Sequence, residues 1–157
     1  MQMIKKFGAV WGVLVVALVF SQGCTSSSGS SSSGSGSISR IQVIPAAASL
    51  QASQKSDVVD SSGNTTTQYT WSSTFVTVIV RDSGGNRVPA GTSVTIACGA
   101  GYLGDNPSVT DPVSSLTLTT DANGQVQVKY TAGFTTGTAS ISATSQGNYG
   151  SATITIV

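Results

Sequence analysis

Residues 120–130 are Thr-Asp-Ala-Asn-Gly-Gln-Val-Gln-Val-Lys-Tyr, and this short stretch decides the fold class. Its Asn-Gly pair tolerates the positive φ angles that tight β turns require. After the pair, Val126, Val128 and Tyr130 alternate with polar residues, which predicts a strand with one buried face. Because Ser114–Thr120 alternates in the same way, we expect a hairpin at this point of the chain.

The same two-residue period recurs along most of the chain. It is clear over Thr74–Arg81, where Val76, Val78 and Val80 share one face. Thr, Val, Ser and Gly are abundant and Glu is absent, a composition that favours strands over helices. We therefore predict an all-β fold, a single immunoglobulin-like antiparallel sandwich of about seven or eight strands. The predicted strands are 38–44, 49–53, 74–81, 93–98, 114–120, 125–130, 138–145 and 151–157, with a long polar loop over 54–70.

The first 37 residues predict where the protein is found. Lys5 and Lys6 precede an apolar run from Ala9 to Phe20, and Ser21, Gln22 and the small Gly23 then lead to Cys24. This order is typical of a bacterial lipoprotein export signal, a class in which the cysteine after the cleavage site receives lipid. We predict a signal peptide over 1–23, lipidation of Cys24, a flexible Ser/Gly-rich tether over 24–37 and a domain over 38–157. An ordinary cleaved signal and an uncleaved anchor are the alternatives.

The predicted location is the bacterial cell envelope, with the lipid anchor as the contact to the membrane. Thr25 follows the cysteine, where an aspartate retains many such proteins at the inner membrane. By resemblance to that class, we expect the outer membrane, with the domain facing either the periplasm or the cell surface. Cys98, on the alternating face of Val94 and Ile96, is expected to be a small buried residue.

The charges argue against several classes of function. Charged residues make up 8% of the chain, against about 25% in typical domains, and the net charge is +1. Nucleic-acid binding needs a basic stripe that this sequence lacks. There is no histidine to act as general base, and no GxSxG motif occurs. We therefore predict no enzymatic activity, no cofactor and no metal site.

Two weaker motifs offer alternatives. Residues 99–104 fit GxGxxG, but no helical pattern follows to hold a dinucleotide phosphate, so a loop is expected. A calcium site is the second alternative, built from Asp82, Asp105, Asp111 and Asp121. These aspartates are dispersed over turns and loops, where Asp is an ordinary residue.

Two stretches resemble the bacterial immunoglobulin-like domain of the invasin/intimin group. Residues 76–96, VTVIVRDSGGNRVPAGTSVTI, are similar to that family's strand, Asp-x-x-Gly-Asn turn, Val-Pro-x-Gly step and following strand. Residues 120–126, TDANGQV, and 135–144, TTGTASISAT, are similar to its hairpin and last strand pair. The resemblance implies a rigid module of the kind found in tandem on adhesins. This chain has one copy and lacks a terminal binding domain, which leaves an adhesive role open.

The predicted function is a membrane-anchored envelope lipoprotein with a structural, adhesive or protein-interaction role. One alternative is a carbohydrate- or cell-wall-binding module that uses exposed aromatic residues, namely Trp71, Tyr102 and Tyr149. Trp71 shares a strand face with Phe75 and Ile79, and this stripe is either exposed or covered by the loop over 54–70. A second alternative is an assembly subunit that exchanges strands, in which 38–53 would dock poorly on its own domain.

Overall fold

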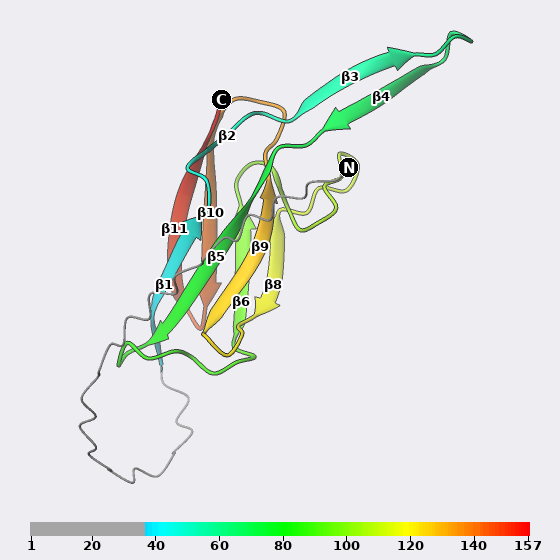
Figure 1. Cartoon of the computed structure of the whole chain (residues 1–157). Coiled ribbons are helices and arrows are strands. Elements are labelled where there is room, and N and C mark those ends of the chain that lie inside the picture. The colour runs from blue at the N-terminus through cyan, green and yellow to red at the C-terminus, as the bar shows by residue number, and fades with distance from the viewer. Residues whose placement is uncertain (1–36) are drawn as a thin grey trace, which may run out of the picture. The chain divides into compact units, whose positions relative to one another are not determined.

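Two antiparallel sheets and one separate hairpin make up the computed structural model, which describes residues 37–157 (Figure 1). The predicted signal peptide over 1–23, Cys24 and the predicted tether as far as Gly36 lie outside the described residues. The four-stranded sheet has the order β1 (Ile38–Pro45), β5 (Ser73–Asp82), β9 (Gln125–Thr131) and β7 (Tyr102–Leu103). The five-stranded sheet has the order β2 (Ser49–Leu50), β11 (Asn148–Ile156), β10 (Gly137–Ser145), β6 (Ser93–Cys98) and β8 (Ser115–Thr119).

The chain passes from one sheet to the other soon after it enters the domain. Strand β1 pairs with β5 along its whole length, from Ile38 to Pro45. After a short connection, β2 pairs in parallel with the end of β11, the last strand. All other strand pairs in the two sheets are antiparallel. Strand β1 therefore forms one edge of the four-stranded sheet and is paired with its own domain along its whole length.

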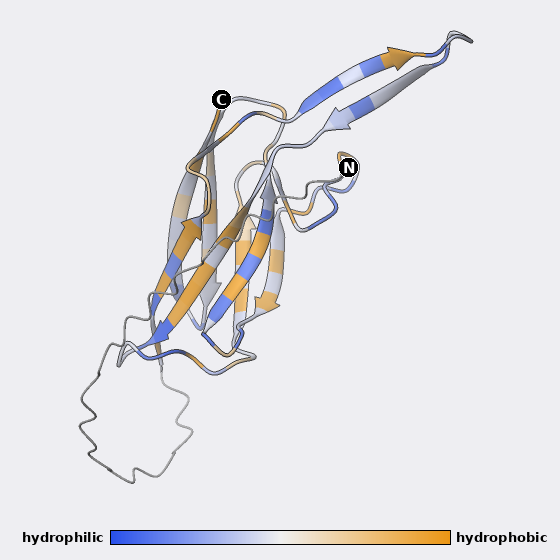
Figure 2. Cartoon of the chain, viewed as in Figure 1, coloured by the Kyte–Doolittle hydropathy of each residue, from blue (hydrophilic) through white to orange (hydrophobic). Residues whose placement is uncertain are grey.

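The core lies between the two sheets and is built from the alternating residues. Val76, Val78 and Val80 of β5 are fully buried, as are Ile96 and Ile141 on the facing sheet. Each such side chain contributes about 1.5–3 kcal/mol through removal of apolar surface from water. Figure 2 shows apolar residues concentrated on the strands of both sheets. The predicted all-β sandwich is confirmed, with three strands beyond the eight predicted: β3, β4 and β7.

The prediction of a loop over 54–70 is wrong. This segment forms a two-stranded hairpin of β3 (Gln54–Val59) and β4 (Thr65–Thr70), which extends beyond the end of the sandwich at which β5 begins (Figure 1). All of its strand residues are exposed. Because neither face of the hairpin is buried, its strands do not need an apolar face. They therefore lack the alternation of apolar and polar residues from which the other strands were predicted.

The Asn-Gly turn forms as predicted, but the strands on either side of it do not pair with each other. Strand β8 pairs with β6 in one sheet, and β9 pairs with β5 and β7 in the other. Backbone hydrogen bonds tie the residues before the turn and the residues after it to different segments of the chain. The amide of Val80 donates to the carbonyl of Gly124 at 2.9 Å, while the amide of Gly91 donates to the carbonyl of Thr120 at 2.8 Å. The turn therefore connects the two sheets.

Candidate functional site

Four aromatic side chains gather where the hairpin joins the sandwich, and we call them the aromatic cluster. Trp71, directly after β4, is at its centre. The Trp71 ring centroid lies 5.5 Å from that of Tyr69, 5.3 Å from that of Tyr102 and 5.3 Å from that of Phe134. Tyr69 stacks on Trp71 at 19°, and Tyr102 meets it edge-on at 82°. Aromatic pairs in such offset and edge arrangements attract each other beyond their area burial.

A buried serine fixes the backbone beneath the aromatic cluster. Ser53, immediately before the hairpin, is 3% exposed. Its hydroxyl donates to the carbonyl of Ala132 at 2.6 Å and accepts from the amide of Ser72 at 3.1 Å. Its amide also donates to the carbonyl of Gly133 at 2.9 Å. Ser53 therefore ties both ends of the hairpin to the loop that carries Phe134.

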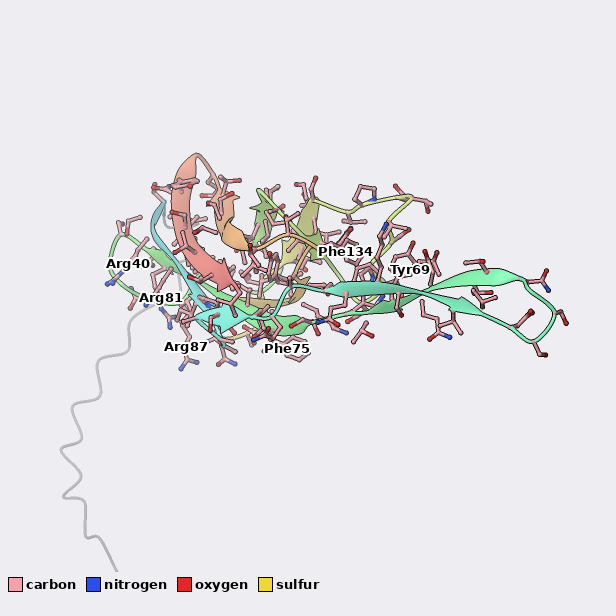
Figure 3. All side chains as sticks on the ribbon, turned by 90° about the horizontal axis from the view of Figure 1, so that it is seen from above. Arg40, Tyr69, Phe75, Arg81, Arg87 and Phe134 are labelled. Carbon is pink, nitrogen blue, oxygen red and sulfur yellow. The ribbon has the colours of Figure 1, made fainter. Side chains whose placement is uncertain are left out.

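The aromatic cluster is partly open to solvent. Tyr69 is 39% exposed, while Trp71, Tyr102 and Phe134 are half-buried. Figure 3 shows Tyr69 and Phe134 close together at the base of the hairpin. The cluster packs the hairpin base against the sandwich and leaves the Tyr69 side chain accessible.

The structure brings together two of the three aromatic residues predicted for a binding surface. Trp71 and Tyr102 are in contact. Tyr149 is 63% exposed and lies at the opposite end of the sandwich, next to Asn148, whose side-chain amide donates to the carbonyl of Ile38 at 2.7 Å. Phe134 belongs to the cluster but was not identified from the sequence. A single large apolar residue in the loop between β9 and β10 was the available signal.

The stripe formed by Trp71, Phe75 and Ile79 is accessible at Phe75 and half-buried at its other two residues. Val76, Val78 and Val80 point inward as predicted, and Phe75, on the opposite face, is 50% exposed. Ile79 on that face is half-buried. Residues 54–70 cover this stripe only at Trp71, on which Tyr69 stacks, and the hairpin otherwise extends beyond the end of the sandwich (Figure 1).

Three aspartates each begin a turn of the same kind, in which the carboxylate accepts hydrogen bonds from backbone amides. At Asp60, Asp82 and Asp121, one carboxylate oxygen accepts hydrogen bonds from the amides two and four residues later, at 2.8–2.9 Å. The residue three positions on is a glycine with φ between 67° and 82°. These turns match the sequences DSSGN, DSGGN and DANGQ. The conformation explains the choice of Asp, which bonds its own turn, and of Gly, which tolerates positive φ.

The bound amides also change the acidity of two of these carboxyls. The amide of Gln125 is the main reason why the pKa of Asp121 is lowered, and Arg87 adds a smaller electrostatic contribution. The amide of Asn64 lowers the pKa of Asp60 in the same way. Asp82 and Asp121, two of the candidate calcium ligands, are thus engaged by their own turns. Within residues 37–157, no three Asp, Glu, His or Cys side chains come together as metal ligands would.

The Gly-rich loop and Cys98 have packing roles. No helix follows residues 99–104; β7 lies there instead. Gly101 has φ of 86°, and a Cβ at this position would clash with the carbonyl of Thr131 and lie 2.7 Å from the hydroxyl of Tyr130. Cys98 is 8% exposed, and burial raises the pKa of its thiol to about 11. A thiol with a raised pKa is a poor nucleophile at neutral pH.

Comparisons with known proteins give no family for the chain. Neither the scan against protein-family models nor the search of curated proteins finds a match. Between Ser37 and Val157, no helix has the length and apolar character needed to cross a lipid bilayer.

Proposed function

We propose that the protein is a lipid-anchored lipoprotein of the bacterial cell envelope that presents one immunoglobulin-like module. The observation that carries the proposal is the order of segments: a basic start, an apolar run, Cys24 and a Ser/Gly tract that ends where the sandwich begins at Ile38. Such an order places a folded module at the end of an anchored chain. The anchor contacts the membrane, and the module has a structural, adhesive or protein-interaction role without catalysis.

Membership of the invasin/intimin-like group is part of the proposal. In its support, each of the two motifs contains an aspartate turn, at Asp82 and at Asp121, with the same pattern of hydrogen bonds. The parallel pairing of β2 with β11 is compatible with an immunoglobulin-like sandwich whose first strand is divided between two sheets.

The chemistry of the titratable groups supports a role without catalysis. Asp60, Asp82 and Asp121 direct their carboxylates toward turn amides, and the Cys98 thiol is buried with a raised pKa. A general acid, general base or nucleophile has to reach a substrate in a suitable protonation state. These groups instead stabilise turns and fill the core.

A carbohydrate-binding role is the second candidate, and the aromatic cluster is the observation that favours it. A groove lined by Gln51, Gln54, Lys55 and Phe134 lies beside the cluster and offers amide and ammonium groups next to an aromatic ring. If this groove binds glycan, Phe134→Ala should weaken retention on purified cell-wall polysaccharide, while Tyr149→Ala, at the other end of the domain, should not. Equal retention of both variants would count against the role.

Fatty-acid incorporation tests the proposed anchor directly. Cells expressing the full chain are fed an alkyne-tagged fatty acid, and the protein is then isolated and probed for the tag. We expect label on the wild-type protein and on Cys98→Ala, and none on Cys24→Ala. The Cys98 variant is a matched control, since Cys24 and Cys98 are the two cysteines of the sequence. Label that persists in Cys24→Ala, or is absent from the wild type, would refute the proposal.

A further inference from the structure

The outer face of the four-stranded sheet gathers most of the cationic side chains of the domain. Arg40 on β1, Arg81 on β5 and Lys129 on β9 occupy strand positions next to buried neighbours, so they point away from the core. Arg87 forms an antiparallel bridge with Arg81 and therefore lies on the same side. Within residues 37–157, the remaining cationic side chain is Lys55, on the hairpin. We call this surface the basic face.

Three of these cations are next to one another. Arg40 is the register partner of Arg81 across β1 and β5, and Arg81 bridges to Arg87. The guanidinium groups of Arg81 and Arg87 bond neutral oxygens of Asn123, at 3.3 Å and 3.2 Å. Like charges directly opposite on neighbouring strands are destabilising. An anionic partner would remove that cost, and a groove lined by Arg40, Arg81 and Gln42, with Asp82 as its one acidic residue, is open to one.

Acidic side chains are absent from the outward strand positions of β1, β5 and β9 between Ile38 and Thr131, apart from Asp82 at the end of β5. Asp82 and Asp121 are the acids near the arginines, and both carboxylates accept hydrogen bonds from turn amides. Asp57 and Asp60 lie on the hairpin. The basic face therefore presents cations outward, while the nearby carboxylates remain bound within the turns.

Exposed apolar side chains accompany the cations. Phe75 is 50% exposed and is the register partner of Lys129, and Ile44 is 39% exposed on β1. Figure 3 shows Phe75 on the same side of the ribbon as Arg87. Cations that reach phosphates and apolar groups that reach the acyl boundary are the combination with which proteins lie on membrane surfaces.

The basic face is also close to the point where the chain enters the domain. Ser37, the first described residue, accepts a hydrogen bond of 3.0 Å at its carbonyl from the amide of Ser83, in the turn after Arg81. If Cys24 carries lipid, this end of the sandwich can lie no farther from the bilayer than the segment between Cys24 and Ser37 can span.

We propose that the basic face binds the anionic headgroup layer of the membrane to which the protein is anchored, so that the four-stranded sheet lies against the lipid. The inference rests on the proposed lipid anchor. A second copy of the chain fits this face poorly, because two basic faces would repel each other. Four cations outnumber the two nearby carboxylates of Asp82 and Asp121, so lipid phosphates add favourable negative charge, and Phe75 and Ile44 enter the interface beside them.

Position-specific quenching tests the orientation. The full acylated protein, purified from membranes, is labelled with a fluorophore at Gln42→Cys on the basic face or at Thr153→Cys, exposed on the opposite sheet. Each form is reconstituted into vesicles of phosphatidylcholine alone or with phosphatidylglycerol, containing a lipid with a headgroup quencher. On anionic vesicles we expect strong quenching at position 42 and weak quenching at position 153. On phosphatidylcholine alone, the difference should be much smaller.

Charge variants identify the source of any preference. Changing Arg40, Arg81 and Arg87 to Gln should shift the balance between lipid-facing and free orientations by about fivefold per arginine, or about a hundredfold in total. Changing the same three residues to Lys should keep the preference, and Lys55→Gln is the control for loss of a charge elsewhere. Equal quenching at positions 42 and 153 on anionic vesicles, or unchanged quenching in the Gln variant, would overturn the inference. Failure of the protein to remain with either type of vesicle would instead refute the anchor.

Discussion

The Tyr130→Phe substitution tests how a buried hydroxyl stabilises the sandwich. Tyr130 is 0% exposed, and its hydroxyl donates a hydrogen bond of 3.0 Å to the carbonyl of Ala100. The variant loses this bond, worth about 1 kcal/mol net, while the carbonyl of Ala100, an exposed residue, stays accessible to water. We expect the free energy of unfolding at pH 7 to fall by about 1 kcal/mol.

The same substitution should alter the response of stability to alkaline pH. Burial raises the pKa of Tyr130 to about 12, and the charge of nearby Cys98 adds to the rise. The stabilisation is therefore fully present below the ordinary tyrosine pKa of 10.0 and is lost as the pH rises through about 12. Phenylalanine has no proton to lose. The difference in stability between the two proteins should consequently shrink between these pH values.

Urea unfolding followed by fluorescence, at pH 7 and at steps up to pH 12, measures both effects. Both proteins should also carry Cys98→Ala, because burial raises the pKa of the Cys98 thiol to about 11 and this group would titrate in the same range. A difference in unfolding free energy that stays constant with pH would refute the account of the buried hydroxyl. Equal stability at pH 7 would refute the role of its hydrogen bond.

Three further changes test other parts of the structure. Thr131 is 0% exposed, and its hydroxyl has no hydrogen-bond partner between residues 37 and 157. Thr131→Val should therefore raise the free energy of unfolding by about 1 kcal/mol, and an unchanged urea midpoint would contradict this. Ser53→Ala removes both hydrogen bonds of the buried hydroxyl and should lower the free energy of unfolding by about 2 kcal/mol. Amide exchange at Ser72 should become faster, and an unchanged exchange rate would contradict the role of Ser53 in holding the base of the hairpin. The folded-state pKa of Asp121 is lowered, so its stabilisation is present above its ordinary pKa of 3.8 and lost as the pH falls below it. Asp121→Ala should therefore lower the Tm at pH 6 and weaken its further decrease on acidification; identical acid profiles would contradict this.

A strand could be predicted from the sequence when one of its faces is buried, because burial imposes a pattern of apolar residues. Strands β5, β6 and β9 were located because one face enters the core, which imposes a two-residue apolar period. The hairpin of β3 and β4 was missed because all of its strand residues are exposed. The turn at Asp121–Gly124 was recognised from its residues, but these specify only the local bend. The bonds from Val80 and Gly91 that assign the flanking strands to different sheets are tertiary.

The candidate sites show the same division between local and tertiary information. Trp71 was identified from its place on a strand, whereas its contact with Phe134 joins segments far apart in sequence. The alignment of Arg40 with Arg81 depends on the register of β1 against β5, which includes a shift between Ile38 and Arg40. Such a local register shift is not encoded in the alternation itself.

Mass spectrometry of the amino-terminal peptide from the protein in its native membranes tests the central claim most directly. We predict a mature chain that begins at Cys24, with diacylglycerol attached through a thioether to that residue. A mature chain that begins at another residue, or that begins at an unmodified Cys24, would contradict the account of a lipid-anchored sandwich.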